Sequence, residues 1–163
     1  MTDQPSHEIV RVVESDKELQ QCCIQVRIDV FVHEQGFPLD VEIDAYDLNP
    51  GTIHFLLRLT PSQKPIGVIR GTRLSEAYYK LSRLAVLKDY RQFKFGRELV
   101  EALHDWVKLD ALEKSTANAA KVVCHSQLPV KGFYAKFGYI PEGAEFDEDG
   151  DPHQKMVLEI PLR

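Results

Sequence analysis

The chain has 163 residues, a formal net charge of −5, 44% hydrophobic residues and 28% charged residues. This length and composition predict one globular domain, residues 1–163, with a core of its own. The acidic balance argues against nucleic acid as a partner, because duplex binding depends on Lys and Arg. No apolar stretch approaches the roughly 20 residues that span a bilayer, so no membrane partner is expected.

The cysteines and the N-terminal leader predict a cytoplasmic protein, with nuclear access left open. The leader lacks the basic and apolar regions of a signal peptide. Cys22 and Cys23 are neighbours, Cys124 is distant and no Cys-x-x-Cys motif occurs, so free thiols in a reducing compartment are expected. His33 and His153 have no second ligand at zinc spacing, so no metal is expected.

The N-terminal half is predicted to contain a strand, a helix and a hairpin. Ser15 and Glu18 have the spacing of a capping box, and apolar residues follow at helical spacing. Two β-rich runs flank a turn with two prolines, which is typical of a hairpin. In chain order we expect a strand at 9–13, a helix at 16–32, an acidic loop at 40–51, and strands at 52–60 and 66–74.

The C-terminal half alternates strands and helices. Apolar residues between 99 and 107 form one stripe of an amphipathic helix, and a proline and a glycine flank the shorter helix after it. We expect strand 80–87, helix 96–112, strand 121–126, helix 129–137, an acidic loop at 142–151 and a last strand at 155–160. The element order β-α-β-β-β-α-β-α-β predicts a mixed α/β layer fold.

The segment between Leu81 and Leu99 predicts an anion site. An apolar strand runs into a short basic turn with one glycine, Gly96, and a long helix follows at once. This order places backbone N–H groups and the positive end of a helix dipole at the carboxyl end of a strand. Such an end binds anions, most naturally a phosphate or pyrophosphate.

Several segments of this sequence resemble the GNAT superfamily of N-acetyltransferases. The strand, the Arg91-x-x-x-x-Gly96 turn and its helix, followed by a strand and Gly-Phe-Tyr-Ala-Lys-Phe-Gly-Tyr at 132–139, are similar to the superfamily pattern. The segments that resemble its ElaA-like branch are Arg-Ile-Asp-Val-Phe-Val-His-Glu-Gln at 27–35, Glu-Ile-Asp at 42–44, Glu-Phe-Asp-Glu at 145–148 and Pro-His at 152–153.

This resemblance implies an α/β (α+β) fold, a mixed β-sheet flanked by helices, whose central parallel strands, 80–87 and 121–126, splay apart. Acetyl-CoA would lie in that cleft, with its pantetheine arm along the first strand and its pyrophosphate on the N–H groups of the turn. Backbone near Leu84 would stabilise the oxyanion of the reaction. The residues implied in cofactor binding are Leu84, Ala85, Val86, Arg91, Gln92, Phe93, Lys94, Phe95, Gly96, Arg97, Tyr134 and Lys136.

Three positions depart from the superfamily pattern. Lys94 replaces the first glycine of the turn, where glycine permits a positive φ, but adds a charge that can reach a phosphate. Ser82 stands where many relatives carry a glutamate proposed as general base, and His125 stands where asparagine is common. The basic residues of the turn either bind phosphate or form a solvated basic surface.

The implied reaction is attack of an amine on a thioester, and the amine must first be neutral. A primary amine with a pKa near 10.4 is only about 0.04% free base at pH 7, so a general base or a water chain leading to one contributes. The residues leave four candidates open, each alternatively a surface carboxylate or a structural histidine: Glu34, Glu42, His54 and His125. The residues assigned to catalysis are Tyr134, Glu34 and His125, and those assigned to the acceptor are Phe31, Glu34, Gln35, Glu42 and His54.

Tyr134 is, by resemblance, the proton donor to the leaving thiolate; the alternative is a core aromatic packed with Phe133 and Phe137. The two acidic loops either draw a cationic amine to the acceptor mouth or are simply solvated. The sequence thus predicts an N-acetyltransferase that uses acetyl-CoA and a primary amine of a small amine, amino sugar, protein or peptide. The alternative is a catalytically silent acyl-CoA-binding sensor. A homodimer is compatible with the sequence, since many relatives pair.

Overall fold

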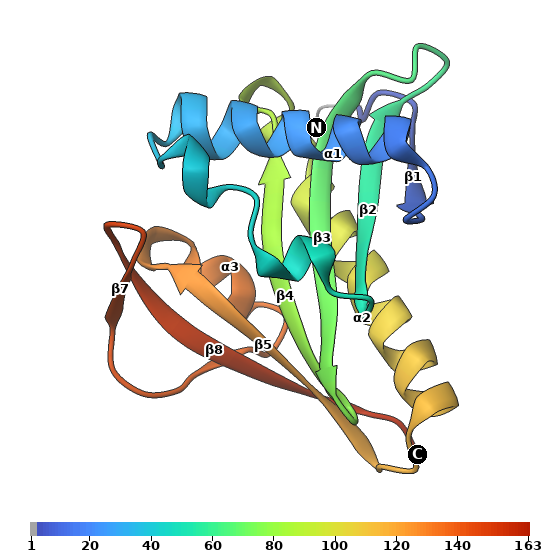
Figure 1. The fold of residues 1–163 in the computed structure, drawn as a ribbon, viewed down its shortest axis with the longest axis vertical. Coiled ribbons are helices and arrows are strands. Elements are labelled where there is room, and N and C mark those ends of the chain that lie inside the picture. The colour runs from blue at the N-terminus through green and yellow to red at the C-terminus, as the bar shows by residue number, and fades with distance from the viewer. Residues whose placement is uncertain (1–2) are drawn as a thin grey trace.

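The computed structural model describes residues 3–163, so Met1 and Thr2 of the polar leader lie outside the described residues. One eight-stranded sheet has the order β1-β2-β3-β4-β5-β8-β6, and β7 pairs with β8 (Figure 1). Its strands are β1 (His7–Val12), β2 (Thr52–Leu59), β3 (Pro65–Ser75), β4 (Tyr78–Val86), β5 (Ala119–Gln127), β6 (Ile140–Pro141), β7 (Phe146–Glu148) and β8 (Asp151–Pro161). This arrangement confirms the predicted mixed sheet flanked by helices.

Helices cover both faces of the sheet. One face carries α1 and the other carries α2, and each covers its own apolar core (Figure 1). The α-helices are α1 (Lys17–Arg27), α2 (Phe95–Lys114) and α3 (Lys131–Ala135); η1 (Ile28–Glu34) is a π-helix, and the 3-10 helices are η2 (Leu39–Val41), η3 (Ala45–Leu48), η4 (Lys88–Phe93) and η5 (Leu128–Val130). Among residues 3–163, none of these helices is long and apolar enough to cross a membrane.

The N-terminal helix differs from its prediction at both ends. Asp16, not Ser15, is the N-cap, and its side chain accepts a hydrogen bond from the Leu19 N–H at 3.0 Å. The predicted capping box on Ser15 is therefore wrong, because the carboxylate one residue later reaches the free N–H groups first. After Arg27 the chain continues as π-helix η1, in which the Gln35 N–H donates to the Val30 carbonyl, five residues back, at 3.0 Å. This wider turn carries the helix two residues beyond the predicted end.

The predicted hairpin is confirmed, because β2 and β3 pair antiparallel from Thr52↔Thr72 to Arg58↔Pro65. The predicted tail is wrong in part. The acidic segment contains β7, which pairs with the start of β8 at Phe146↔His153. The last strand therefore begins at Asp151 instead of residue 155. The polar side chains of this segment suggested a solvated loop, but its backbone N–H and carbonyl groups pair across a short turn.

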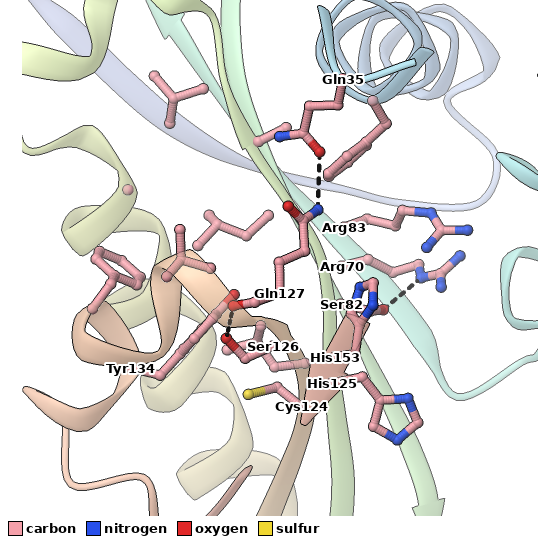
Figure 2. A pocket seen from close by; sticks show the side chains of 18 of the residues that line it. Gln35, Arg70, Ser82, Arg83, Cys124, His125, Ser126, Gln127, Tyr134 and His153 are labelled. Atoms are coloured by element: carbon pink, nitrogen blue, oxygen red, sulfur yellow. Dashed lines mark hydrogen bonds between the residues drawn. The ribbon is translucent and has the colours of Figure 1, made fainter. Parts of the chain in front are cut away.

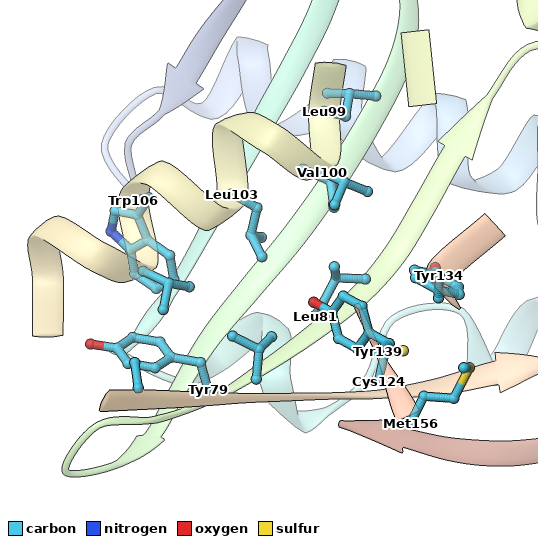
Figure 3. Close-up of a cluster of buried hydrophobic side chains, with 14 of the residues drawn as sticks. Tyr79, Leu81, Leu99, Val100, Leu103, Trp106, Cys124, Tyr134, Tyr139 and Met156 are labelled. Atoms are coloured by element: carbon cyan, nitrogen blue, oxygen red, sulfur yellow. The ribbon is translucent and has the colours of Figure 1, made fainter. Parts of the chain in front are cut away.

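The side chains of α2 fill the larger core. Leu99, Val100, Leu103 and Trp106 lie over the strands in Figure 3, and the Trp106 ring meets Tyr79 edge-on with centroids 5.3 Å apart. Close packing requires glycine at residue 71, since a Cβ there would lie 2.6 Å from Leu103 Cδ1. The predicted apolar stripe is thus confirmed as the face that fixes α2 on the sheet.

Strands β4 and β5 separate after a short parallel pairing. They pair only from Tyr78↔Lys121 to Lys80↔Val123, after which β4 follows β3 and β5 follows β8. A bulge in β4 adds to the divergence: Val68 pairs with Ala85 and Arg70 with Ser82, so two residues face one, and Arg83 has φ +53°. The splayed central strands that the family resemblance implied are confirmed.

Candidate active site

A cavity of about 1180 Å³ opens where β4 and β5 separate. Figure 2 shows Gln35, which follows η1, and side chains from β3, β4, β5, α3 and β8 around it. Tyr134 of α3 lies on one side of β5, and His125 lies on the other. Successive side chains of a strand alternate between its faces, so β5 presents different chemistry to the two sides of the opening.

Beyond Lys80, the edge of β4 that borders the cavity is not paired with another strand of the described chain. On its other edge the Leu87 N–H donates to the Ile66 carbonyl of β3 at 2.9 Å. Backbone groups of an antiparallel strand point alternately to its two sides, so the Val86 N–H and carbonyl face the opening. The Val86 carbonyl accepts a hydrogen bond from Arg91 Nε at 3.0 Å. Leu84, Ala85 and Val86 all line the cavity, which places an extended-chain binding edge along its wall.

The N-terminus of α2 lies at one end of the same cavity. Lys94 precedes the helix with φ +62° and ψ +29°, a left-handed conformation, and no side chain caps the helix. The first N–H groups of α2 have no partner within the helix. Lys94, Gly96 and Arg97 line the cavity beside them. The conformation that glycine adopts readily is therefore retained with a lysine in its place.

Arg91 is held by two partners. Its guanidinium forms a bidentate ion pair with Glu34, with Nη1–Oε2 and Nη2–Oε1 distances of 2.6 and 2.5 Å, besides its bond to Val86. The Arg91 hydrogen bond holds the pKa of Glu34 below its ordinary value. Arg91 lines the cavity and Glu34 does not. The geometry does not support Glu34 as the general base or an acceptor ligand, because both carboxylate oxygens already bind a cation.

The remaining residues assigned to the cofactor divide into two groups. Lys136 of the segment after α3 lines the cavity, as do the β4 and α2 residues described above. Gln92, Phe93 and Phe95 do not line it, and the Phe95 side chain is fully buried in the core. A direct side-chain contact to the cofactor is therefore not supported for these three, although the Phe95 N–H is one of the free groups at the start of α2.

Tyr134 combines burial with access to the cavity. Its side chain is 8% exposed and lines the opening, and its ring meets those of Phe133 and Tyr139 edge-on, with centroids 5.2 and 5.6 Å away. Burial raises the pKa of Tyr134 far above its ordinary value, so the phenol keeps its proton at neutral pH. Within residues 3–163 no side chain hydrogen-bonds to this hydroxyl. The sequence allowed two roles for Tyr134, core packing or proton donation, and its position in the structure is compatible with both.

The residues assigned to the acceptor side are also separated by the structure. Phe31 and Gln35 of the η1 segment line the cavity, and Gln35 Oε1 accepts a hydrogen bond from Gln127 Nε2 at 2.9 Å. His125 lines the cavity too, with its Nδ1 2.8 Å from Glu148 Oε1. His54 does not line it. No group of three or more His, Cys, Asp or Glu side chains suited to a metal ion occurs in the described chain, residues 3–163.

Arg27 is the centre of a buried ion-pair network. Its side chain is fully buried, with Nε 2.9 Å from Glu42 Oε2 and Nη1 2.7 Å from Asp47 Oδ1. The His54 Nε2 atom lies 3.3 Å from Arg27 Nη1, and because a guanidinium only donates, this nitrogen accepts. Burial lowers the pKa of His54. Its lone pair is therefore already occupied, which disfavours His54 as a base or acceptor ligand.

Arg70 and Arg83 extend the network beneath the cavity. Arg70 is 1% exposed and binds both oxygens of Asp44 at 2.7 and 3.0 Å, while its Nε donates to Ser82 Oγ at 2.9 Å. Arg83 Nε lies 2.8 Å from Glu42 Oε2. Glu42, Asp44 and Asp47 of the first acidic loop are thus paired with arginines. For these three acids, neither predicted role is correct: they do not attract a cationic amine, and they are not simply solvated. Glu42 lines the cavity but its carboxylate is not free to act as a base.

This network predicts acid-sensitive stability. Burial alone would raise the pKa of Asp47, but the hydrogen bond from Arg27 and the charges of Arg27 and Arg70 outweigh it and hold the pKa well below the ordinary value. The pKa of Asp44 is lowered likewise, against burial, by Arg70 and Arg83. A depressed folded-state pKa gives stabilisation that is full above the unfolded pKa, about 3.9, and is lost as the pH falls through the folded value.

We therefore expect the free energy of unfolding from urea titrations to fall steeply as the pH drops below about 4. The Asp47→Asn variant should be less stable at pH 7 and show a shallower decline, because one of the groups that must be protonated has been removed. An equal pH slope for the two proteins would contradict this assignment.

Arg27, Arg70 and Arg83 were not predicted as site-shaping residues. A signal was present, since Arg27 adjoins the apolar stripe of the first helix and Arg70 follows an apolar run in β3. Arginines in buried positions require carboxylate or carbonyl partners. The pattern alone, however, did not say which acids would meet them.

Comparison with known proteins agrees with this geometry. A family model described as an acetyltransferase (GNAT) domain matches residues 47–160. A Bacillus subtilis (strain 168) protein named as a candidate acetyltransferase is 35% identical over 148 residues, 91% of this chain and 94% of that protein. A crystal structure described as a candidate N-acetyltransferase from Lactobacillus plantarum is 25% identical with a TM-score of 0.81, over 95% of this chain and 99% of that one. Escherichia coli ElaA is 24% identical with a TM-score of 0.78, over 93% and 98%. The chain therefore belongs to the GNAT acetyltransferase family and has an ElaA-like fold.

Proposed function

We propose that this protein is an N-acetyltransferase that uses acetyl-CoA to acetylate a primary amine. The observation that supports this most strongly is the continuity of one cavity from the free edge of β4 to the uncapped start of α2. A pantetheine arm carries amide groups that pair with a free strand edge, and a pyrophosphate suits a helix N-terminus. The groups needed for the two parts of one cosubstrate are thus adjacent.

The charges around the cavity agree with that orientation. The α2 and α3 segments contribute Lys94, Arg97 and Lys136, suited to the phosphates of the cosubstrate. The loop around η2 and the β7–β8 turn contribute Asp40 and Asp149, which suit a cationic amine. When bound, acetyl-CoA supplies the thioester that the amine attacks. Tyr134 holds a proton for the departing sulfur, and backbone N–H groups of the β4 edge near Leu84 would polarise the carbonyl.

The test of this proposal is binding followed by turnover. Calorimetry should show that acetyl-CoA binds at least tenfold more tightly than acetyl-pantetheine, which lacks the pyrophosphate and nucleotide. Thiol release should then be measured with spermidine, glucosamine 6-phosphate and a lysine peptide. Absence of acetyl-CoA binding at millimolar excess would overturn the proposal, and tight binding without turnover on any amine would favour the sensor alternative.

Two substitutions at Lys94 distinguish the effect of its left-handed backbone conformation from the effect of its charge. Glycine at this position should raise the free energy of unfolding by about 0.5–1 kcal/mol, because relief of the left-handed strain exceeds the entropy that glycine loses. The Lys94→Gln variant keeps the strain and should not be stabilised. Both variants should weaken acetyl-CoA about tenfold in calorimetry, the value of one charge-assisted bond near 1.5 kcal/mol. Unchanged affinity in both would remove Lys94 from the phosphate site.

A further inference from the structure

Two histidines and a glutamate meet on the side of β5 that faces away from Tyr134. His125 Nδ1 lies 2.8 Å from Glu148 Oε1, and His153 Nε2 lies 3.7 Å from Glu148 Oε2. Figure 2 shows both imidazoles beside β5, where they line the cavity with Glu148. The three residues come from β5, β7 and β8, which are paired strands of one sheet, so their separation is fixed by backbone register.

The hydrogen bonds determine where each ring carries its proton. A carboxylate only accepts, so the His125 Nδ1 atom is the donor to Glu148. A backbone carbonyl also only accepts, so His153 Nδ1 is the donor in its 2.8 Å contact with the Asp151 carbonyl. A neutral imidazole with its proton on Nδ1 has its lone pair on Nε2. His125 therefore presents a basic nitrogen that no other group of residues 3–163 occupies.

Aromatic packing fixes the orientation of both rings. The Phe146 ring meets His125 edge-on, with centroids 5.0 Å apart and planes at 79°, and it stacks on His153 at 6.2 Å and 29°. The His153 side chain is 6% exposed and that of His125 is 29% exposed. His153 and Phe146 thus form the supporting layer, and His125 is the member of the cluster that solvent and ligands reach.

The other base candidates are already engaged. Glu34 binds Arg91 through both oxygens, Glu42 binds Arg27 and Arg83, and the His54 lone pair accepts from Arg27. His125 is the one member of the predicted set of four that combines a cavity position with a free proton-accepting atom.

We propose that His125 Nε2 is the proton acceptor for the amine substrate and that Glu148 is its positioning residue. This inference rests on the proposed function and deepens it. The substrate ammonium gives a proton to Nε2, which passes it to solvent, and the freed lone pair forms the C–N bond with the thioester carbonyl carbon. As the C–S bond breaks, Tyr134 gives its hydroxyl proton to the sulfur. The Tyr134 oxygen then takes up the second proton of the amine. The ammonium and thioester thus yield an amide, a thiol and one proton.

The placement of the two groups suits this division of work. Tyr134 and His125 lie on opposite sides of β5 (Figure 2), so the proton acceptor for the amine and the proton donor for the sulfur do not compete for one position. The charged or titratable groups that face His125 are Glu148 of β7, His153 of β8 and Lys80 of β4, which lines the same cavity. Of these, only Glu148 hydrogen-bonds to the ring.

A first experiment reads the tautomer directly and requires no known acceptor. Long-range ¹⁵N–¹H correlation spectra of the full chain, labelled at histidine, should show neutral His125 protonated at Nδ1. In the Glu148→Gln variant neutral His125 should become a mixture of both tautomers, because an amide can donate as well as accept a hydrogen bond. Glu145→Gln, an exposed residue of the same tail, should leave the tautomer of His125 unchanged. A proton on Nε2 of neutral His125 in the wild type, or the same tautomer in Glu148→Gln and wild type, would overturn the inference.

A second experiment reads the chemical role. With the fastest amine of the panel, His125→Gln should lower kcat/KM at pH 7 about 10- to 100-fold while acetyl-CoA affinity stays unchanged. The loss should be much smaller with hydroxylamine, which is largely neutral at this pH. In Glu148→Gln the acidic limb of the kcat/KM profile should move to lower pH. Wild-type protein that neither binds acetyl-CoA nor releases thiol would refute the proposed function itself; an active His125→Gln with the wild-type profile would refute only the role of His125.

Discussion

Replacing Arg27 by methionine is expected to lower the free energy of unfolding by about 3–5 kcal/mol. The Arg27 side chain is fully buried, and its loss leaves Glu42 and Asp47 as buried carboxylates with fewer cationic partners. Methionine fills a similar volume, so the effect comes mainly from the uncompensated charge and not from a cavity. Urea unfolding monitored by circular dichroism measures the change.

The matched control for this variant is Arg58→Met. Arg58 also pairs with a glutamate, with Nε 2.7 Å from Glu8 Oε1, but the Glu8 side chain is 42% exposed. An exposed pair contributes at most about 1 kcal/mol, so Arg58→Met should change stability far less than Arg27→Met. Similar losses in the two variants would show that burial of the ion pair does not determine its contribution.

Replacing Tyr134 by phenylalanine is expected to lower kcat about 10- to 100-fold with little change in acetyl-CoA affinity. The substitution keeps the ring that packs on Phe133 and Tyr139 and removes only the hydroxyl proton. Since the leaving thiol has a pKa near 8.5, protonation assists its departure without being indispensable. Steady-state thiol release and calorimetry with acetyl-CoA measure the two quantities.

Tyr139→Phe controls for loss of a buried hydroxyl nearby. Tyr139 is 2% exposed, and its hydroxyl lies 2.8 Å from His104 Nε2 instead of facing the cavity. This variant should lose about 1 kcal/mol of stability and retain kcat. If Tyr134→Phe retains kcat as well, Tyr134 is a packing residue and not the proton donor.

The sequence by itself predicted the helices and strands whose apolar residues recur at regular spacing. The apolar stripe of α2, the hairpin of β2 and β3, and the strand, turn and helix around Gly96 all follow from side-chain spacing and turn residues. These features are short-range, because burial of one face of a helix or strand constrains residues two to four positions apart. The start of α2 after a strand and a basic turn was therefore predictable. The positive φ of Lys94 was not, because a lysine in place of glycine does not by itself show which dihedral angle the turn keeps.

Tertiary structure alone decided which charged groups meet. Sequence composition determined that the loop at 40–51 is acidic, but only strand register and helix packing brought Arg27, Arg70 and Arg83 onto its carboxylates. The same holds for Glu34 with Arg91 and for Glu148 with His125, pairs separated by 57 and 23 residues. The protonation state and the role of an ionisable side chain depend on how deeply it is buried and on which charged partner it contacts. That partner is set by the fold of the whole chain, whereas the elements themselves are set by their own residues.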